Sequence, residues 1–108
     1  MPLPMIRTEA APTETTPAVF LTEPFSGFEF EATHWVDITD VIEEKIALAK
    51  CHKSQDDAFI AAFGEGMGID HWVKNTASRR GEQCGVKYAE AFRPMLSRGL
   101  VKPYSILP

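Results

Sequence analysis

The order of apolar and polar residues predicts two short strands joined by an irregular segment. Residues 18–22 are mostly apolar and are stopped by Glu23 and Pro24, which is typical of a short buried strand. Residues 35–39 alternate apolar and polar side chains, which predicts a strand with one exposed face. The aromatic segment 25–31 follows no regular period, and we expect a loop or an extended edge there.

Helical spacing begins after the second strand. We expect Asp40 to cap a helix of about four turns, with Glu43 completing a capping box. Ile42 and Ile46 lie on the apolar stripe of this helix. A shorter apolar segment at residues 58–63 follows and is ended by a glycine.

A third helix is expected to begin at Asp70 and to run towards Phe92, with Pro94 marking its end. Gly81 and Gly85 lie inside this helix, where each costs up to about 1 kcal/mol relative to alanine. We therefore expect another backbone to approach closely along the stripe of mostly small side chains on this helix, which consists of Val73, Ala77, Gly81, Cys84, Gly85 and Tyr88.

These elements predict one small α/β unit with two short strands and about three helices. Residues 1–17 are rich in proline, threonine and glutamate, so we expect a loop or a disordered lead-in. Residues 94–108 are expected to form an extended tail. The folded part therefore spans residues 18–93.

The composition is that of an ordinary globular protein, with 44% hydrophobic and 24% charged residues among 108. The net charge of −4 argues against nucleic acid as a partner, because phosphates require a basic surface. No apolar run approaches the roughly 20 residues of a membrane span, and the first residues do not resemble a secretory signal. We therefore expect a cytoplasmic protein with no membrane partner, in which Cys51 and Cys84 are small buried thiols inside helices.

Candidate metal ligands are sparse. Cys51 and His52 are adjacent on a predicted helix and point about 100° apart, so both cannot readily reach one ion. No C-x-x-C or H-x-x-x-H pair is present, so we expect no metal site. Asp56 and the aspartate after it are expected in a solvated loop that opens the next helix, and Arg79 and Arg80 on an exposed ion-pair face.

Three motifs occur in a recognisable order: WVDITD at 35–40, CHKSQ at 51–55 and YAEAF at 88–92. Together they resemble the C-terminal part of the PIG-L/LmbE family of zinc-dependent N-deacetylases, over about residues 18–93. The resemblance implies a Rossmann-like α/β parent that removes acetyl groups from N-acetylglucosamine conjugates or related N-acyl amides. The family's zinc-binding sequence, a His-Pro-Asp-Asp-Glu run, is absent from these 108 residues. We therefore assign no catalytic residue, no metal ligand and no cofactor to this chain, although the parent family uses zinc.

The resemblance implies that the chain supplies scaffold and part of the substrate wall of such an enzyme and is inactive alone. His52 and Gln55 are the substrate-side candidates, able to hydrogen-bond a sugar hydroxyl; equally, residues 52–55 can simply terminate a helix. The expected partners are the missing N-terminal half or a second copy, with a small glycoconjugate as the parent's substrate. The alternative is a free-standing helical interaction module that docks through the small-residue stripe and has no catalytic activity.

Overall fold

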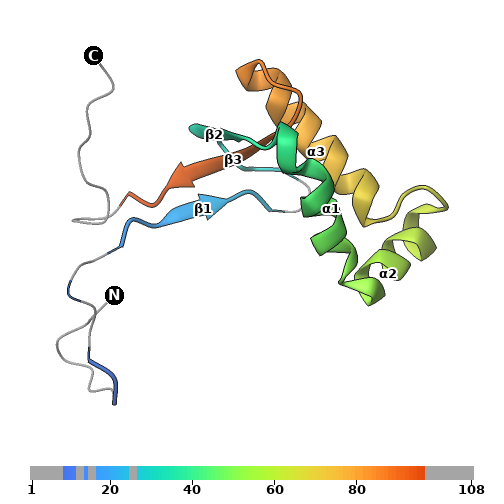
Figure 1. Ribbon diagram of the computed structural model, residues 1–108, viewed down its shortest axis with the longest axis horizontal. Helices are drawn as coiled ribbons and strands as arrows, with labels where there is room; N and C mark the ends of the chain where they lie inside the picture. The colour runs from blue at the N-terminus through green and yellow to red at the C-terminus, as the bar shows by residue number, and fades with distance from the viewer. Residues whose placement is uncertain (1–8, 12–13, 15–16, 25–26, 97–108) are drawn as a thin grey trace.

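The computed structural model describes residues 9–11, 14, 17–24 and 27–96 of the chain. The described part contains three strands and three α-helices, so the predicted α/β class is confirmed and one strand is added (Figure 1). In chain order the elements are β1 (Phe20–Thr22), β2 (His34–Asp37), the 3-10 turn η1 (Thr39–Val41), α1 (Ile42–Lys50), α2 (Lys53–Phe63), α3 (Ile69–Cys84) and β3 (Ala89–Pro94).

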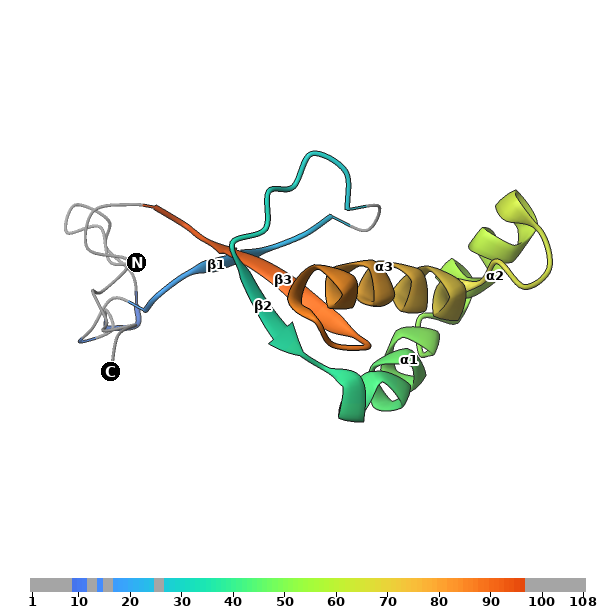
Figure 2. The ribbon, with the colours of Figure 1, turned by 90° about the horizontal axis from the view of Figure 1, so that it is seen from above.

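The strands form one antiparallel sheet in the order β1-β3-β2, so the last strand lies between the first two. Trp35 of β2 is paired with Ala91, and Leu21 of β1 is paired with Arg93. Helix α3 packs across β3, and α1 packs beside α3 (Figure 2). Because every described pair of strands is antiparallel, a Rossmann-like parent with its parallel sheet stays a prediction.

The third helix ends at Cys84, so the prediction that it continues to Phe92 is wrong. Gly85 has a φ of 82°, and its N–H donates to the carbonyl of Gly81 at 2.8 Å. The helix thus ends in a glycine in the left-handed conformation, a common C-terminal cap. The chain then turns into β3, where Ala89 and Ala91 are buried at 1% and 2% exposure. Their two-residue spacing is that of a strand, with both alanines facing α3.

The expected close approach along the small-residue stripe is made by the chain itself. A Cβ at Gly81 would collide with the carbonyl oxygen of Val86 and lie 2.6 Å from that of Lys87. Ala77 is also buried, at 2% exposure, in the core that α1 forms with α3. Gly81 and Ala77 are therefore already covered and offer no free surface for a partner.

The helix after β2 also differs from its prediction. Residues 39–41 form η1, and Asp40 makes no side-chain cap for η1 or α1. Asp37 holds this turn instead, because its Oδ1 accepts hydrogen bonds from the Thr39 hydroxyl at 2.7 Å and the Thr39 N–H at 2.9 Å. These two bonds, the hydroxyl first, hold the pKa of Asp37 below its ordinary value of 3.8.

The lowered pKa of Asp37 gives a prediction about pH. Because the pKa of Asp37 is lower in the folded state, its ionised carboxylate stabilises the turn at pH values above the ordinary pKa. This contribution is lost as the pH falls through the folded-state pKa of Asp37. Thr39→Val removes the hydroxyl donor, so we expect the pKa of Asp37 to rise towards its ordinary value in an NMR carboxyl titration. Thr39→Ser keeps the donor and should leave the pKa low; equal values in the valine and serine variants would contradict this assignment.

The core is small and lies between α1, α3 and the end of the sheet. It consists of Ile38, Ile42, Ile46 and Ala77, with Val73 and Tyr88 packed against it. The apolar stripe predicted for the first helix is thus confirmed. Two expected burials are wrong: all three residues of β1 are exposed, and so are Cys51 and Cys84, because both thiols lie at helix ends.

Loop and tail predictions are partly tested. Residues 27–31 are irregular as predicted, and positions 25 and 26 lie outside the described residues. Residues 95 and 96 continue without regular structure, while 97–108 and most of 1–17 are outside the described residues. Pro94 ends β3, where it pairs with Phe20, and does not lie in the tail.

Candidate functional site

The predicted substrate-side residues lie where α1 passes into α2. His52 is the N-cap residue of α2, with φ −80° and ψ 64°, so the quartet 52–55 opens a helix and does not end one. The carbonyl of His52 accepts hydrogen bonds from the N–H groups of Gln55 at 3.0 Å and Asp56 at 3.1 Å. The imidazole of His52 makes no cap bond, and both candidate side chains are exposed. Their substrate-side role stays a prediction.

The histidines do not come together as zinc ligands would. His34 lies on β2, His52 at the start of α2 and His71 on α3. Within the described residues, no three histidine, cysteine, aspartate or glutamate side chains lie close enough to hold a metal ion. The residues present do not provide the ligand set of the deacetylase family that the sequence resembles, so no chemical step is assigned to zinc in this chain.

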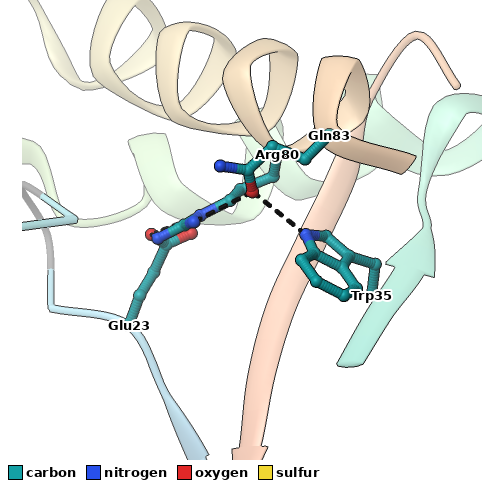
Figure 3. Close-up of polar contacts among 4 residues, drawn as sticks. All are labelled: Glu23, Trp35, Arg80 and Gln83. Carbon is teal, nitrogen blue, oxygen red and sulfur yellow. Dashed lines mark hydrogen bonds and ion pairs between the residues drawn. The ribbon is translucent and has the colours of Figure 1, made fainter. Parts of the chain in front are cut away.

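A polar network around the buried Arg80 links the segment after β1 to α3 and β2 (Figure 3). The Arg80 guanidinium donates to Glu23 Oε2 through Nη2 at 2.8 Å and Nε at 3.0 Å, and to Gln83 Oε1 through Nη1 at 3.0 Å. The same Gln83 oxygen accepts from the indole N–H of Trp35 at 3.1 Å. Arg80 is only 6% exposed, so the prediction of an exposed ion-pair face is wrong for this residue.

Arginines also hold the loop between β1 and β2. The Phe30 ring lies 6.0 Å from the Arg80 guanidinium and 5.3 Å from that of Arg93. Contacts of this kind contribute about 0.5–1 kcal/mol each at exposed sites. Glu23 and Phe30 thus attach both ends of this loop to the face of the sheet that α3 covers. The arginine pairs follow from tertiary contacts distant in sequence, and no local motif predicts them.

The opposite face of the sheet carries exposed apolar side chains. Ala89 and Ala91 face α3, so Glu90 and Phe92, which alternate with them along β3, point to the opposite face. Residues that pair directly across neighbouring strands share a face, so the partners of Glu90 and Phe92 lie on this face as well. Phe20 and Val36 are 48% and 50% exposed. We call this surface the open sheet face; it is formed by Phe20, Thr22, His34, Val36, Glu90 and Phe92.

A hollow of about 300 Å³ continues this surface next to α1. It is lined by Ile38, Val41, Glu44, Lys45, Leu48 and Glu90. Lys45 and Glu90 form an ion pair in its lining, with Nζ and Oε1 2.5 Å apart, and Leu48, which also lines the hollow, is 71% exposed. The hollow and the open sheet face therefore form one apolar surface with a neutralised charge pair inside it.

None of the described helices is long and apolar enough to cross a membrane. Comparison of the chain with family models, with curated proteins and with solved structures finds no match.

Proposed function

We propose that the chain is the C-terminal segment of a PIG-L/LmbE-like N-deacetylase, in which it serves as non-catalytic scaffold. The open sheet face is the observation that carries this proposal. An antiparallel sheet packed on a helix through one face usually presents polar side chains on the other, whereas here Phe20 and Val36 are about half exposed on that face. The rest of the parent, including its zinc-binding half, would cover that face.

The positions of two of the three motifs support the same proposal. WVDITD spans β2 and the turn held by Asp37, and YAEAF runs from Tyr88 into β3. These two motifs form one ladder, in which Val36 pairs with Glu90, and the Thr39 hydroxyl accepts from the Tyr88 N–H at 3.2 Å. Thr39 and Tyr88 are 49 residues apart along the chain. The first and third motifs therefore build one structural unit, as expected if they were inherited together.

The role of the segment in the parent follows from what its residues can do. His52 and Gln55 would line the substrate side, where exposed imidazole and amide groups can hydrogen-bond the hydroxyls of an N-acetylglucosamine conjugate. Zinc and the general base would come from the N-terminal half. We place the protein in the cytoplasm, a reducing compartment that suits two exposed free thiols.

The test is assembly with a metal-binding half. We expect the chain to form a one-to-one complex with an N-terminal segment of a PIG-L/LmbE-like deacetylase that carries the His-Pro-Asp-Asp-Glu run. Val36→Asp should weaken the complex about 10-fold or more, because it places a charge on an exposed apolar position of the open sheet face, on the edge strand β2. Val36→Thr keeps the branched shape and should have the smaller effect. Binding that is equally strong in both variants would show that another surface joins the two halves.

A second candidate is an interaction module without catalytic activity. The thin core favours it, because no large side chain in the described part is fully buried. The docking surface would then be the open sheet face and its hollow, since Ala77 and Gly81 at the centre of the small-residue stripe are buried. A stable complex with a protein that lacks the zinc-binding run would favour this candidate over the first.

A further inference from the structure

Helix α2 is held on the protein by very little buried surface. None of its 11 residues is buried, and Phe63 near its end is 56% exposed. Both ribbon views place α2 at the end of the molecule away from the sheet (Figures 1 and 2). A helix of this length is marginal in water by itself. The order of α2 therefore depends on a few specific contacts.

One of these contacts is a helix cap supplied across two helices. Gly68 is the N-cap residue of α3 and has no side chain to cap it. Asp56 of α2 takes this role, because its Oδ1 accepts a hydrogen bond from the N–H of Ile69 at 2.8 Å. A Cβ at Gly68 would lie 2.5 Å from the same oxygen, so only glycine leaves room for the carboxylate. Asp56 thus attaches α2 to the start of α3.

Further contacts of α2 are apolar and come from its second half, where Ile60 lies against Gly68 and the rings of Phe59 and Phe63 meet. The Phe63 ring meets the Trp72 ring edge-on, with 5.3 Å between centroids, and stacks on Phe59 at 6.3 Å. Trp72 is itself fixed by its indole N–H, which donates to the carbonyl of Met67 at 3.1 Å. Ring pairs of this kind contribute about 0.5–1.5 kcal/mol each, whereas the Asp56 carboxylate makes a single hydrogen bond of defined direction. The carboxylate cap is therefore the most directional contact of α2.

Both ends of α2 have backbone suited to a hinge. His52 leaves the helical region with ψ 64°, which separates α2 from α1. Gly64 and Gly66 follow with φ of 105° and 80°, and a Cβ at either position would meet nothing within 4 Å. A rotation or unwinding of α2 can be taken up at these positions without moving α1 or α3.

We propose that α2 is a latched arm, in which the Asp56 carboxylate is the latch and α2 is released from α3 as one unit. The released arm opens while the core of α1 and α3 stays folded. His52 and Gln55 begin this arm, so its release would also move the predicted substrate wall, a consequence that rests on the proposed function. The latch itself does not depend on that function.

Native-state hydrogen exchange of the full chain in increasing urea tests the latch. We expect the amides of residues 57–63 to exchange through an opening with weak urea dependence. The amides of α1 and of the α3 core around Ala77 should exchange through a larger opening with strong urea dependence. Asp56→Ala should speed exchange in α2 about 5-fold, as expected for the loss of a helix cap.

Asp57→Ala is the matched control. Asp57 is exposed on the next position of the same helix, so its replacement makes the same change of charge without touching α3. We expect exchange in α2 to be unchanged in this variant. The proposal is overturned if Asp57→Ala has the same effect as Asp56→Ala, or if α2 in the unmodified protein exchanges with the same protection and urea dependence as Ala77. Because the readout involves neither substrate nor zinc, failure here would leave the proposed function standing.

Discussion

Replacing Arg80 with alanine is expected to lower the free energy of unfolding by about 3–5 kcal/mol. The side chains of Arg80 and Glu23 are 7% and 12% exposed, so the substitution leaves a carboxylate buried without its partner. Gln83 Oε1 also loses the hydrogen bond that Arg80 donates to it. The position of the Gln83 side chain is then less fixed, which weakens the hydrogen bond that Trp35 donates to the same oxygen. Small domains have only about 5–15 kcal/mol of stability, so urea denaturation followed by circular dichroism should show a large shift of the midpoint.

Two variants separate this effect from a general sensitivity of α3. Lys74 on the same helix forms an ion pair with Glu43 at 3.2 Å, but the two side chains are 46% and 77% exposed. Lys74→Ala should therefore cost less than about 1 kcal/mol. The double variant Arg80→Met with Glu23→Leu removes both charges and should regain most of the stability lost by Arg80→Ala. Equal losses for Arg80→Ala and Lys74→Ala would show that burial does not strengthen the Arg80 pair.

Gly81→Ala is the second substitution with a large expected effect, and its sign is informative. Helix propensity alone predicts a gain of up to about 1 kcal/mol when alanine replaces glycine in a helix. The added Cβ would collide with the carbonyl oxygen of Val86 and lie 2.6 Å from that of Lys87. These are backbone atoms of the turn that leads into β3, so they cannot move aside as a side chain can. We expect a net loss of about 1–3 kcal/mol.

The control for Gly81→Ala is Asn75→Ala on the exposed side of α3. This substitution also raises helix propensity but meets no neighbouring backbone, so urea denaturation should show equal or greater stability. A gain of stability from Gly81→Ala would mean that the turn at 85–88 does not pack on α3 as described.

The local order of apolar and polar residues was sufficient to predict those helices and strands whose conformation depends mainly on their own sequence. The alternation at 35–39 predicted β2, and the spacing of Ile42 and Ile46 predicted the buried side of α1. The break between α1 and α2 was placed a few residues too late, at 52–57, because neither Cys51 nor His52 is a residue that ends helices, and only the backbone of His52 marks it. Strand β3 was missed because alanine, glutamate and phenylalanine suit a helix equally well. Its strand conformation depends on pairing with both β1 and β2.

The candidate sites show the same limit. The sequence placed His52 and Gln55 together at the C-terminal end of the first helix. The structure keeps them together, but at the N-terminal end of α2. The buried Arg80 was missed because its partner Glu23 is 57 residues away, and a pair of adjacent arginines ordinarily faces solvent. The latch at Asp56 was missed for the same reason, since its partner is the backbone of another helix.

The packing of the two sheet faces connects the fold to the proposed function. One face packs on α3 through Ala89 and Ala91, and Arg80 and Arg93 hold the loop after β1 beside it, while Leu21 and Trp35 on that face stay 38% exposed. The other face keeps Phe20 and Val36 half exposed. Such a segment can be ordered locally and still require a covering partner.

The most direct test of this account is the zinc content and the deacetylase activity of the purified 108-residue chain, alone and in complex with a zinc-binding N-terminal half. We predict no stoichiometric zinc and no deacetylation of an N-acetylglucosamine conjugate by the chain alone, and both in the complex. Stoichiometric zinc together with deacetylation by the chain alone would contradict the account, because the catalytic centre would then lie within these residues.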